Sequence, residues 1–222
     1  MTVHAGLTEC RLCPRLVEWR ERKATTEKRA AFAGEEYWGR PVPSFGSLDA
    51  PILVVGLAPA AHGGNRTGRM FTGDRSGDWL YRALHRAGLA TSPDDEDPDL
   101  GLIDVRITAV CHCAPPDNKP TTVEIATCVD TWLIPEVAAM PPRVVVTLGQ
   151  LAWTQVLRRG ADWGWAVPRP RPRFGHGAEV DLEPGPVLLG SYHPSQQNTF
   201  TGRLTEEMFD AVWRRAKQLS GT

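Results

Sequence analysis

Five cysteines are the side chains of this sequence best suited to holding a metal centre. Cys10 and Cys13 are separated by two residues, a spacing that presents both thiolates to one metal. Cys113 and Cys128 offer a second pair, and four thiolates bind either zinc or an iron–sulfur cluster. The spacing does not separate these two cofactors. Cys111 is a fifth thiol beside Cys113, and the local pattern does not choose between them.

Two loops carry the other side chains that could do chemistry. The glycine-rich segment 58–77 contains one carboxylate, Asp74, just before an expected helix. There it either caps the helix or acts as a general base. His193 directly follows an apolar segment, where an imidazole is either a structural hydrogen-bonding group or a catalytic one. Both loops are therefore candidate parts of one site.

The elements that must position these loops are read from the apolar pattern. Continuous apolar runs are typical of parallel strands covered on both faces, and four are expected, at 52–57, 102–110, 143–148 and 187–192. Helical patterns are expected at 8–32, 78–87, 121–140, 149–159 and 204–219. We expect Ser76 to cap the second of these helices and Pro135 to bend or break the third.

Alternation of strands and helices predicts a three-layer α/β/α sandwich around a four-stranded parallel sheet, with residues 1–222 forming a single domain. Ligands of such sheets bind beyond the carboxyl ends of the strands. The segments 58–77, 111–120 and 193–198 all follow expected strands, so we expect them to meet at that edge.

Composition and charge exclude several classes of protein. No apolar run approaches the ~18 residues of a membrane span, which excludes a transmembrane protein. No signal-peptide pattern is present, so we expect a cytoplasmic protein with reduced thiols. The motifs GxGxxG, GK[ST] and GxSxG are absent, which argues against dinucleotide, P-loop and serine-hydrolase chemistry.

The formal net charge of −1 gives no general attraction to nucleic acid. The charges are nevertheless unevenly distributed, because five arginines fall within 158–173 and six acidic residues within 94–104. Segments of this kind are most often solvated surface. We therefore expect one basic region and one acidic loop.

Three segments resemble the motifs of the uracil-DNA glycosylase superfamily, and they are most similar to its family 5, the type b enzymes. They are GLAPAAHGGNRTGRMFTGDRSG, HCAPPDNKP and HPSQQN. The resemblance extends from Cys10 to the final helix. It implies the same α/β/α sandwich and a [4Fe–4S] cluster. The implied cluster ligands, which leave Cys111 as the spare thiol, are Cys10, Cys13, Cys113 and Cys128.

The resemblance also implies the reaction. A monofunctional enzyme of this family hydrolyses the N-glycosidic bond of uracil, or of other deaminated or modified bases such as hypoxanthine, and leaves an abasic site. The base must first be flipped out of the DNA. Phe71 then corresponds to the stacking residue, and Asp74 to the group that activates water. His193 corresponds to the donor that stabilises charge developing on the O2 side of the base.

The remaining roles implied by the resemblance concern binding. Further base-pocket residues are Gly56, Ala58, Asn118 and Asn198. Expected DNA contacts are Arg66, Arg69, Ser195 and Arg171, and the arginines Arg11, Arg15 and Arg20 near the cluster are also expected to face phosphates. The expected partner is uracil- or hypoxanthine-containing DNA, bound by a monomer.

Two other classes of function stay open from the sequence. A non-catalytic DNA-binding module with zinc held by four cysteines would use the cysteines and arginines but leave Asp74 and His193 without a role. A nucleosidase would break the same bond in free nucleosides. Zinc in a colourless preparation would favour the first, and activity on free deoxyuridine the second.

Overall fold

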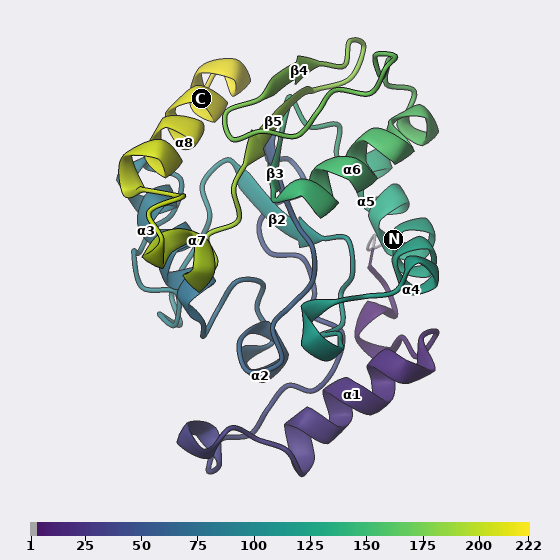
Figure 1. Ribbon diagram of the computed structural model, residues 1–222, viewed down its shortest axis with the longest axis vertical. Coiled ribbons are helices and arrows are strands. Elements are labelled where there is room, and N and C mark those ends of the chain that lie inside the picture. The colour runs from purple at the N-terminus through teal and green to yellow at the C-terminus, as the bar shows by residue number, and fades with distance from the viewer. Residues whose placement is uncertain (1–3) are drawn as a thin grey trace.

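The sheet contains five strands in the order β2-β1-β3-β5-β4. A computed structural model describes residues 4–222 (Figure 1). The strands are β1 (Ile52–Gly56), β2 (Val105–Ala109), β3 (Val144–Leu148), β4 (Glu179–Asp181) and β5 (Val187–Ser191). The four strands expected from the sequence are present and parallel.

The prediction of a four-stranded, purely parallel sheet was wrong at one edge. β4 adds a fifth strand that pairs antiparallel with β5. Its three residues alternate between exposed and half-buried and contain no apolar run. An edge strand this short leaves no pattern by which to recognise it.

Helices cover both faces of the sheet, as the three-layer prediction requires (Figure 1). Their bounds are α1 (Pro14–Thr25), α2 (Gly64–Thr67), α3 (Arg75–Arg86), α4 (Thr122–Cys128), α5 (Ile134–Ala139), α6 (Gln150–Arg159), α7 (Gln196–Phe200) and α8 (Glu206–Ser220). One core cluster lies between the sheet and α3 and α8, and includes Leu80, Leu84 and Trp213. A second lies on the opposite face and includes Ile125 of α4 and Trp153 of α6.

The expected helices differ from the observed ones at their ends. The segment 8–32 is helical over only Pro14–Thr25, flanked by short 3₁₀ turns, because Pro14 starts the helix after Cys13. α3 is capped by Asp74, not by Ser76. The irregularity expected near Pro135 takes the form of a π-helical turn at Val129–Leu133, which joins α4 to α5 without a break in the helical backbone. The short helices α2 and α7 were not expected.

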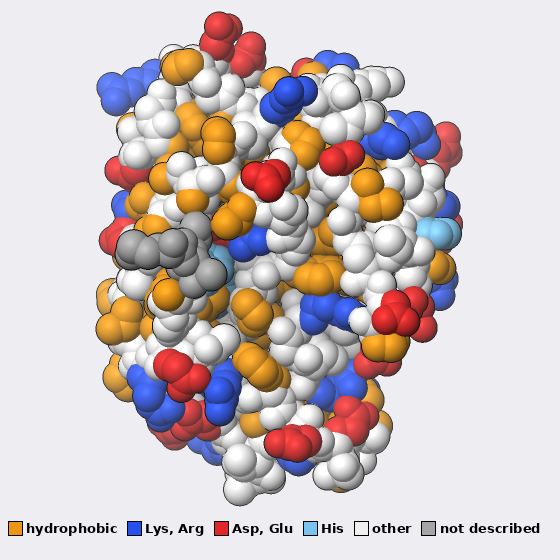
Figure 2. Space-filling view, turned by 180° about the vertical axis from the view of Figure 1, so that it is seen from behind, with side chains coloured by type: hydrophobic (Ala, Val, Ile, Leu, Met, Phe, Trp, Pro, Cys, Tyr) orange, Lys and Arg blue, Asp and Glu red, His pale blue; other side chains and the backbone are white. Residues whose placement is uncertain are grey.

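Acidic and basic side chains are interspersed over the face shown in Figure 2. Of residues 4–222, no helix has both the length and the apolar character needed to cross a membrane.

Candidate active site

A cavity of about 330 Å³ opens where the segments after β1, β2 and β5 meet. This is the carboxyl edge of the sheet, where parallel α/β folds bind ligands. Six of the candidate residues from the sequence line it together: Ala58, Phe71, Asp74, Asn118, His193 and Ser195. Gly56 and Asn198 do not line the cavity, and both instead position residues that do.

Asp74 is held by the start of α3. Its Oδ1 accepts hydrogen bonds from the main-chain N–H groups of Ser76, at 2.8 Å, and Gly77, at 3.2 Å. Its Oδ2 lies against Gly63, where a Cβ would collide with it. Burial raises the pKa of Asp74 above its usual value, and the two N–H groups oppose that shift. One carboxylate oxygen is thus fixed by the backbone, and the other takes no hydrogen bond from the described residues.

Phe71 has a left-handed backbone conformation, with φ of 54°, which is uncommon for an aromatic residue. Its ring lies against Gly56 at the end of β1, where a Cβ would approach two ring atoms to 2.8 Å. The ring centroid is 5.9 Å from that of His193. The absence of a side chain at Gly56 therefore leaves room for the Phe71 ring. This explains the glycine in the motif without a contact between Gly56 and the base.

His193 follows β5, and its loop is closed by two side chains of the HPSQQN segment. Asn198 donates from Nδ2 to the His193 carbonyl at 2.8 Å, and Ser195 caps α7 by accepting from Asn198 N–H. Burial lowers the pKa of His193 to about 4. At neutral pH the imidazole is consequently uncharged, with one ring N–H available to donate.

Asn118 reaches the same cavity from the PPDNKP loop. Asp117 and Asn118 both have left-handed backbone conformations, with φ of 53° and 55°. Asn and Asp tolerate this region better than other residues with a Cβ. The tight turn places Asn118 in the cavity lining together with residues of the 58–77 loop.

Four cysteines line a second, smaller pocket between the N-terminal segment and the chain after β2. They are the four that the resemblance implied as ligands: Cys10, Cys13, Cys113 and Cys128. Cys111 is fully buried in the core beside the sheet and does not line the pocket. The same four thiols therefore line one pocket, and Cys111 lies behind it in the core, with its thiol in hydrogen-bond contact with that of Cys128.

This pocket fits a thiolate-bound metal centre. Burial raises the pKa of Cys113 to about 12 and that of Cys13 to about 11, so thiolates there need compensating positive charge. A bound metal supplies that charge. Arg20, itself buried, adds more by donating to Cys113 Sγ at 2.9 Å and to the Cys10 carbonyl at 3.0 Å.

Residues 43–217 match the model of the "Uracil DNA glycosylase superfamily". The chain is 54% identical to the type-5 uracil-DNA glycosylase of Mycobacterium leprae, over 99% of this chain and 95% of that protein. It is 51% identical to the type-5 enzyme of Thermus thermophilus, over 97% and 95%, and 46% identical to that of Pyrobaculum aerophilum, over 97% and 91%. The chain belongs to the type-5 uracil-DNA glycosylase family.

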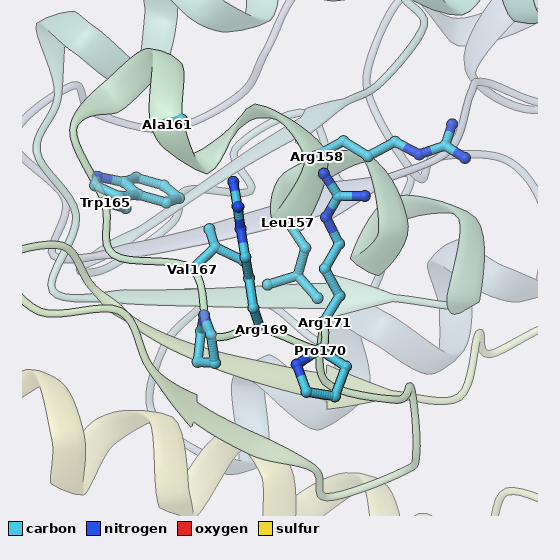
Figure 3. A pocket seen from close by; sticks show the side chains of 9 residues that line it. Leu157, Arg158, Ala161, Trp165, Val167, Arg169, Pro170 and Arg171 are labelled. Atoms are coloured by element: carbon cyan, nitrogen blue, oxygen red, sulfur yellow. The ribbon is translucent and has the colours of Figure 1, made fainter.

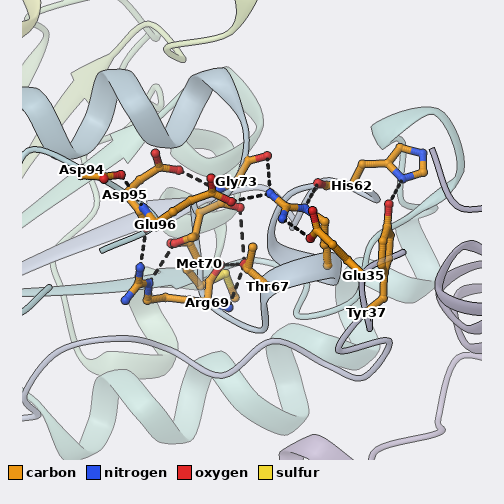
Figure 4. Close-up of polar contacts among 12 residues, drawn as sticks. Glu35, Tyr37, His62, Thr67, Arg69, Met70, Gly73, Asp94, Asp95 and Glu96 are labelled. Atoms are coloured by element: carbon orange, nitrogen blue, oxygen red, sulfur yellow. Dashed lines mark hydrogen bonds and ion pairs between the residues drawn. The ribbon is translucent and has the colours of Figure 1, made fainter. Parts of the chain in front are cut away.

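Within this type-5 glycosylase, two of the arginines expected to contact DNA face inward. Arg66 is 8% exposed and pairs with Glu35 at 2.5 Å and Glu96 at 2.6 Å. Arg69 donates to the carbonyls of Asp95 and Asp97. Figure 4 shows these contacts. Because both guanidinium groups are engaged by the protein, we do not retain either residue as a DNA contact.

The same contacts correct the interpretation of the acidic segment. It docks against the 58–77 loop, and Asp95 accepts from Gly73 N–H at 2.6 Å, directly before Asp74. Burial raises the pKa of Asp95 to about 6. The contact between the acidic segment and the 58–77 loop, here called the brace, was not predicted from the sequence. The run of six acidic residues and the arginines of that loop were a signal for it.

The remaining arginines near the cysteines are also largely engaged. Arg11 pairs with Glu21, and Arg15 with Glu124, whereas Arg20 contacts the cysteines. Arg171 lies outside the cavity. It lines a separate pocket of about 520 Å³, with Arg158 and Arg169 beside it (Figure 3).

Proposed function

We propose that this chain removes uracil from DNA by hydrolysing its N-glycosidic bond, leaving an abasic site without cutting the strand. The observation that carries the proposal is the shared cavity, in which Asp74, Phe71 and His193 converge from two separate loops. Membership of the type-5 family supports the same reaction. A carboxylate and a neutral imidazole beside an aromatic wall suit a reaction that separates charge.

The base enters the cavity after flipping out of the duplex, which costs a few kcal/mol of unstacking. The Phe71 ring offers a face against which the pyrimidine stacks, and the Asn118 amide offers both a donor and an acceptor to the base edge. These two contacts orient the glycosidic bond.

His193 stabilises the leaving base. As the bond breaks, negative charge develops on the O2 side of uracil, and the N–H of a neutral imidazole donates to it. The low pKa of His193 keeps the ring neutral throughout the physiological range. The Asn198 contact fixes the loop, so the donor is in place before the charge forms.

Asp74 acts on the sugar. Its backbone-held Oδ1 fixes the carboxylate, and Oδ2 orients a water molecule toward C1′ and accepts its proton. The negative charge also stabilises the cationic sugar in the transition state. Asp74 thus serves both as the cap of α3 and as the general base.

We further propose that other deaminated bases, such as hypoxanthine, are accepted. The segment Ala58-Pro59-Ala60 contributes no polar side chain to the cavity. A site rejects a wrong base strongly when that base leaves one of the buried polar groups of the site without a hydrogen-bond partner. An apolar wall has no such groups, so it excludes few bases.

For the cysteine pocket we propose a [4Fe–4S] cluster bound by Cys10, Cys13, Cys113 and Cys128. Its contribution is structural, since hydrolysis transfers no electrons. The cluster would position α1, because Cys13 is the residue directly before this helix and Arg20 of the helix donates to Cys113. Zinc is the competing occupant, and metal analysis with an absorption spectrum separates the two.

The test is an end-labelled duplex with one uracil, followed by alkaline strand cleavage. The proposal predicts cleavage only after alkali treatment, and negligible release of base from free deoxyuridine. A hypoxanthine duplex tests the broader range. If folded protein with its metal cleaves neither duplex, the proposal is wrong, and release from free deoxyuridine instead identifies a nucleosidase.

A further inference from the structure

An open groove of about 670 Å³ continues from the base cavity toward α1. The two share the residues Ala60, Asp74, Ser76, Asn118 and Ser195, so the cavity and the groove adjoin. On the N-terminal side the groove is lined by Trp19, Lys23 and Arg29, and on the other by Gln196 and Gln197 of α7. None of the three N-terminal residues belongs to the motifs that carried the resemblance.

The groove has a positive electrostatic character. Arg29 is exposed and has no acidic partner among residues 4–222. Lys23 pairs with Glu27 at 2.7 Å and lies 4.3 Å above the Trp19 ring. On the groove floor, burial lowers the pKa of His62, and the charges of Lys23 and Arg29 lower it further.

The acidic groups that face the groove are few. Asp117 lies at its rim, and Asp74 lies deeper, where the groove joins the cavity. Arg75, also in the lining, adds a further positive charge. An anion entering from the side of α1 therefore meets cations before it meets a carboxylate.

Trp19 supplies an aromatic ring among these charges, and the Arg22 guanidinium lies 5.2 Å from the ring centroid in addition to Lys23. Trp19 is half-buried and lines the groove, while its indole Nε1 is buried without a hydrogen-bond partner among the described residues. An aromatic ring beside a cationic groove is the arrangement with which proteins bind single-stranded nucleic acid, because bases stack on the ring while cations follow the phosphates.

Hydrogen bonds of Arg20 tie α1 to its neighbours on two sides. Arg20 joins it to Cys113 and to the Cys10 carbonyl. In the opposite direction, the Arg20 carbonyl accepts from Asn65 Nδ2 of α2 at 3.2 Å. The helix that carries Trp19 and Lys23 is thus tied both to the cysteine pocket and to the 58–77 loop.

We propose that α1 and the segment after it that carries Arg29 form one wall of a subsite for the nucleotides that flank the flipped base on its own strand. Arg29 and Lys23 bind phosphate there, and Trp19 stacks with a flanking base. This inference rests on the proposed function, since it concerns the same substrate. It assigns to the N-terminal segment a direct part in holding DNA, in addition to its cysteines.

The first test measures affinity with DNA carrying a tetrahydrofuran abasic site, which cannot be cleaved. Arg29→Ala is expected to weaken binding about fivefold and to reduce the slope of log K against log salt by about 0.9 on duplex DNA. Arg214→Ala is the matched control, because Arg214 is exposed, has no ion pair among the described residues and lies on α8, away from the groove. Equal effects of the two variants would overturn the proposal.

The second test uses uracil oligonucleotides shortened on one side of the lesion. On the full-length strand, Trp19→Ala is expected to lose about tenfold in kcat/KM, and Trp19→Phe to retain most of it. Removing the flanking nucleotides on the side that occupies the groove should lower kcat/KM of the wild type. On this shortened strand the wild type and Arg29→Ala should have the same kcat/KM. Removing the nucleotides on the other side should leave the higher kcat/KM of the wild type intact.

The outcomes separate this proposal from the function on which it rests. If the wild type fails to cleave the full-length oligonucleotide, the proposed function is wrong. If the wild type cleaves it but the effect of Arg29→Ala is the same on every length, the groove holds no flanking nucleotide. Arg29 is exposed and has no ion pair among residues 4–222, so its variant reports on binding even if Trp19→Ala fails to fold.

Discussion

The base cavity and the cysteine pocket are built in opposite ways. In the cavity, hydrogen bonds between side chains and the main chain position the reactive groups: two main-chain N–H groups donate to Asp74, and the Asn198 side chain donates to the His193 carbonyl. In the cysteine pocket, four cysteine side chains from three segments line one pocket, and burial disfavours the thiolates of Cys13 and Cys113. The hydrogen bonds of the cavity form within the protein itself, whereas we propose that a metal centre completes the cysteine pocket and its attachment to α1.

The largest expected effect is that of Asp74→Asn, which should change turnover but not thermal stability. Asp74→Asn is expected to lower kcat about 10³-fold, or about 4 kcal/mol, because the amide does not accept a proton from water. The Asn oxygen still accepts from both N–H groups, so the melting temperature should stay within a degree or two. Single-turnover cleavage and thermal unfolding measure the two quantities. Unchanged turnover would reduce Asp74 to a helix cap.

The reverse pattern is expected in the cysteine pocket. Cys113→Ser should lower the free energy of unfolding by about 3 kcal/mol and deplete bound iron, because a ligand is lost from a site that holds α1. Cys111→Ser is the control for iron content, since this buried thiol does not line the pocket although it contacts Cys128. Iron content and urea unfolding are the readouts. Loss of iron from the Cys111 variant alone would show that the ligand set is wrong.

A smaller effect is expected from removal of the His193 imidazole, the proposed hydrogen-bond donor to the leaving base. His193→Ala should lower kcat about 10²-fold, because one preorganised donor to the leaving base is removed. In the wild type, the pKa of about 4 means that His193 does not titrate between pH 6 and pH 8. A pH–rate profile that turns at the ordinary imidazole pKa, and loses that turn in the variant, would contradict a neutral donor.

The smallest effect concerns the brace behind the cavity. The pKa of Asp95 is raised to about 6, above its unfolded value, so folding favours the protonated form. The resulting loss of stability is therefore absent below the unfolded pKa, grows as pH rises toward 6 and is constant above 6. Asp95→Asn should stabilise the protein by about 1 kcal/mol at pH 7.5, after allowance for partial solvent screening, and by less at pH 5.

Urea unfolding at the two pH values measures this difference. Asp99→Asn is the control, because Asp99 is an exposed carboxylate of the same acidic segment. Destabilisation of the Asp95 variant at both pH values would show that Asp95 acts as an ionised brace.

The four parallel strands were predictable because each lies in a mostly apolar run, and β1 was expected to within one residue of its observed end. β4 was not, because its pairing with β5 is decided by the chain around it and not by its own three residues. The same holds for α2 and α7, four and five residues long, which depend on the loops they close.

The residues of the site also differ in whether local sequence could predict their positions. Asp74 and His193 were predictable because each directly follows or precedes a recognisable element. The inward orientation of Arg66 was not, since its partners Glu35 and Glu96 lie about thirty residues away on either side. Ion pairs between distant segments leave no local periodicity, so the sequence pattern predicts surface charge for such side chains.

The most direct test of the account is a crystal structure of the Asp74→Asn variant with uracil-containing DNA. The variant should bind but not cleave, and so retain the substrate. The account predicts a flipped uracil in the cavity, stacked on Phe71, with its edge at Asn118 and His193 toward O2. A uracil bound elsewhere on the protein, or left stacked in the duplex with the cavity empty, would contradict it.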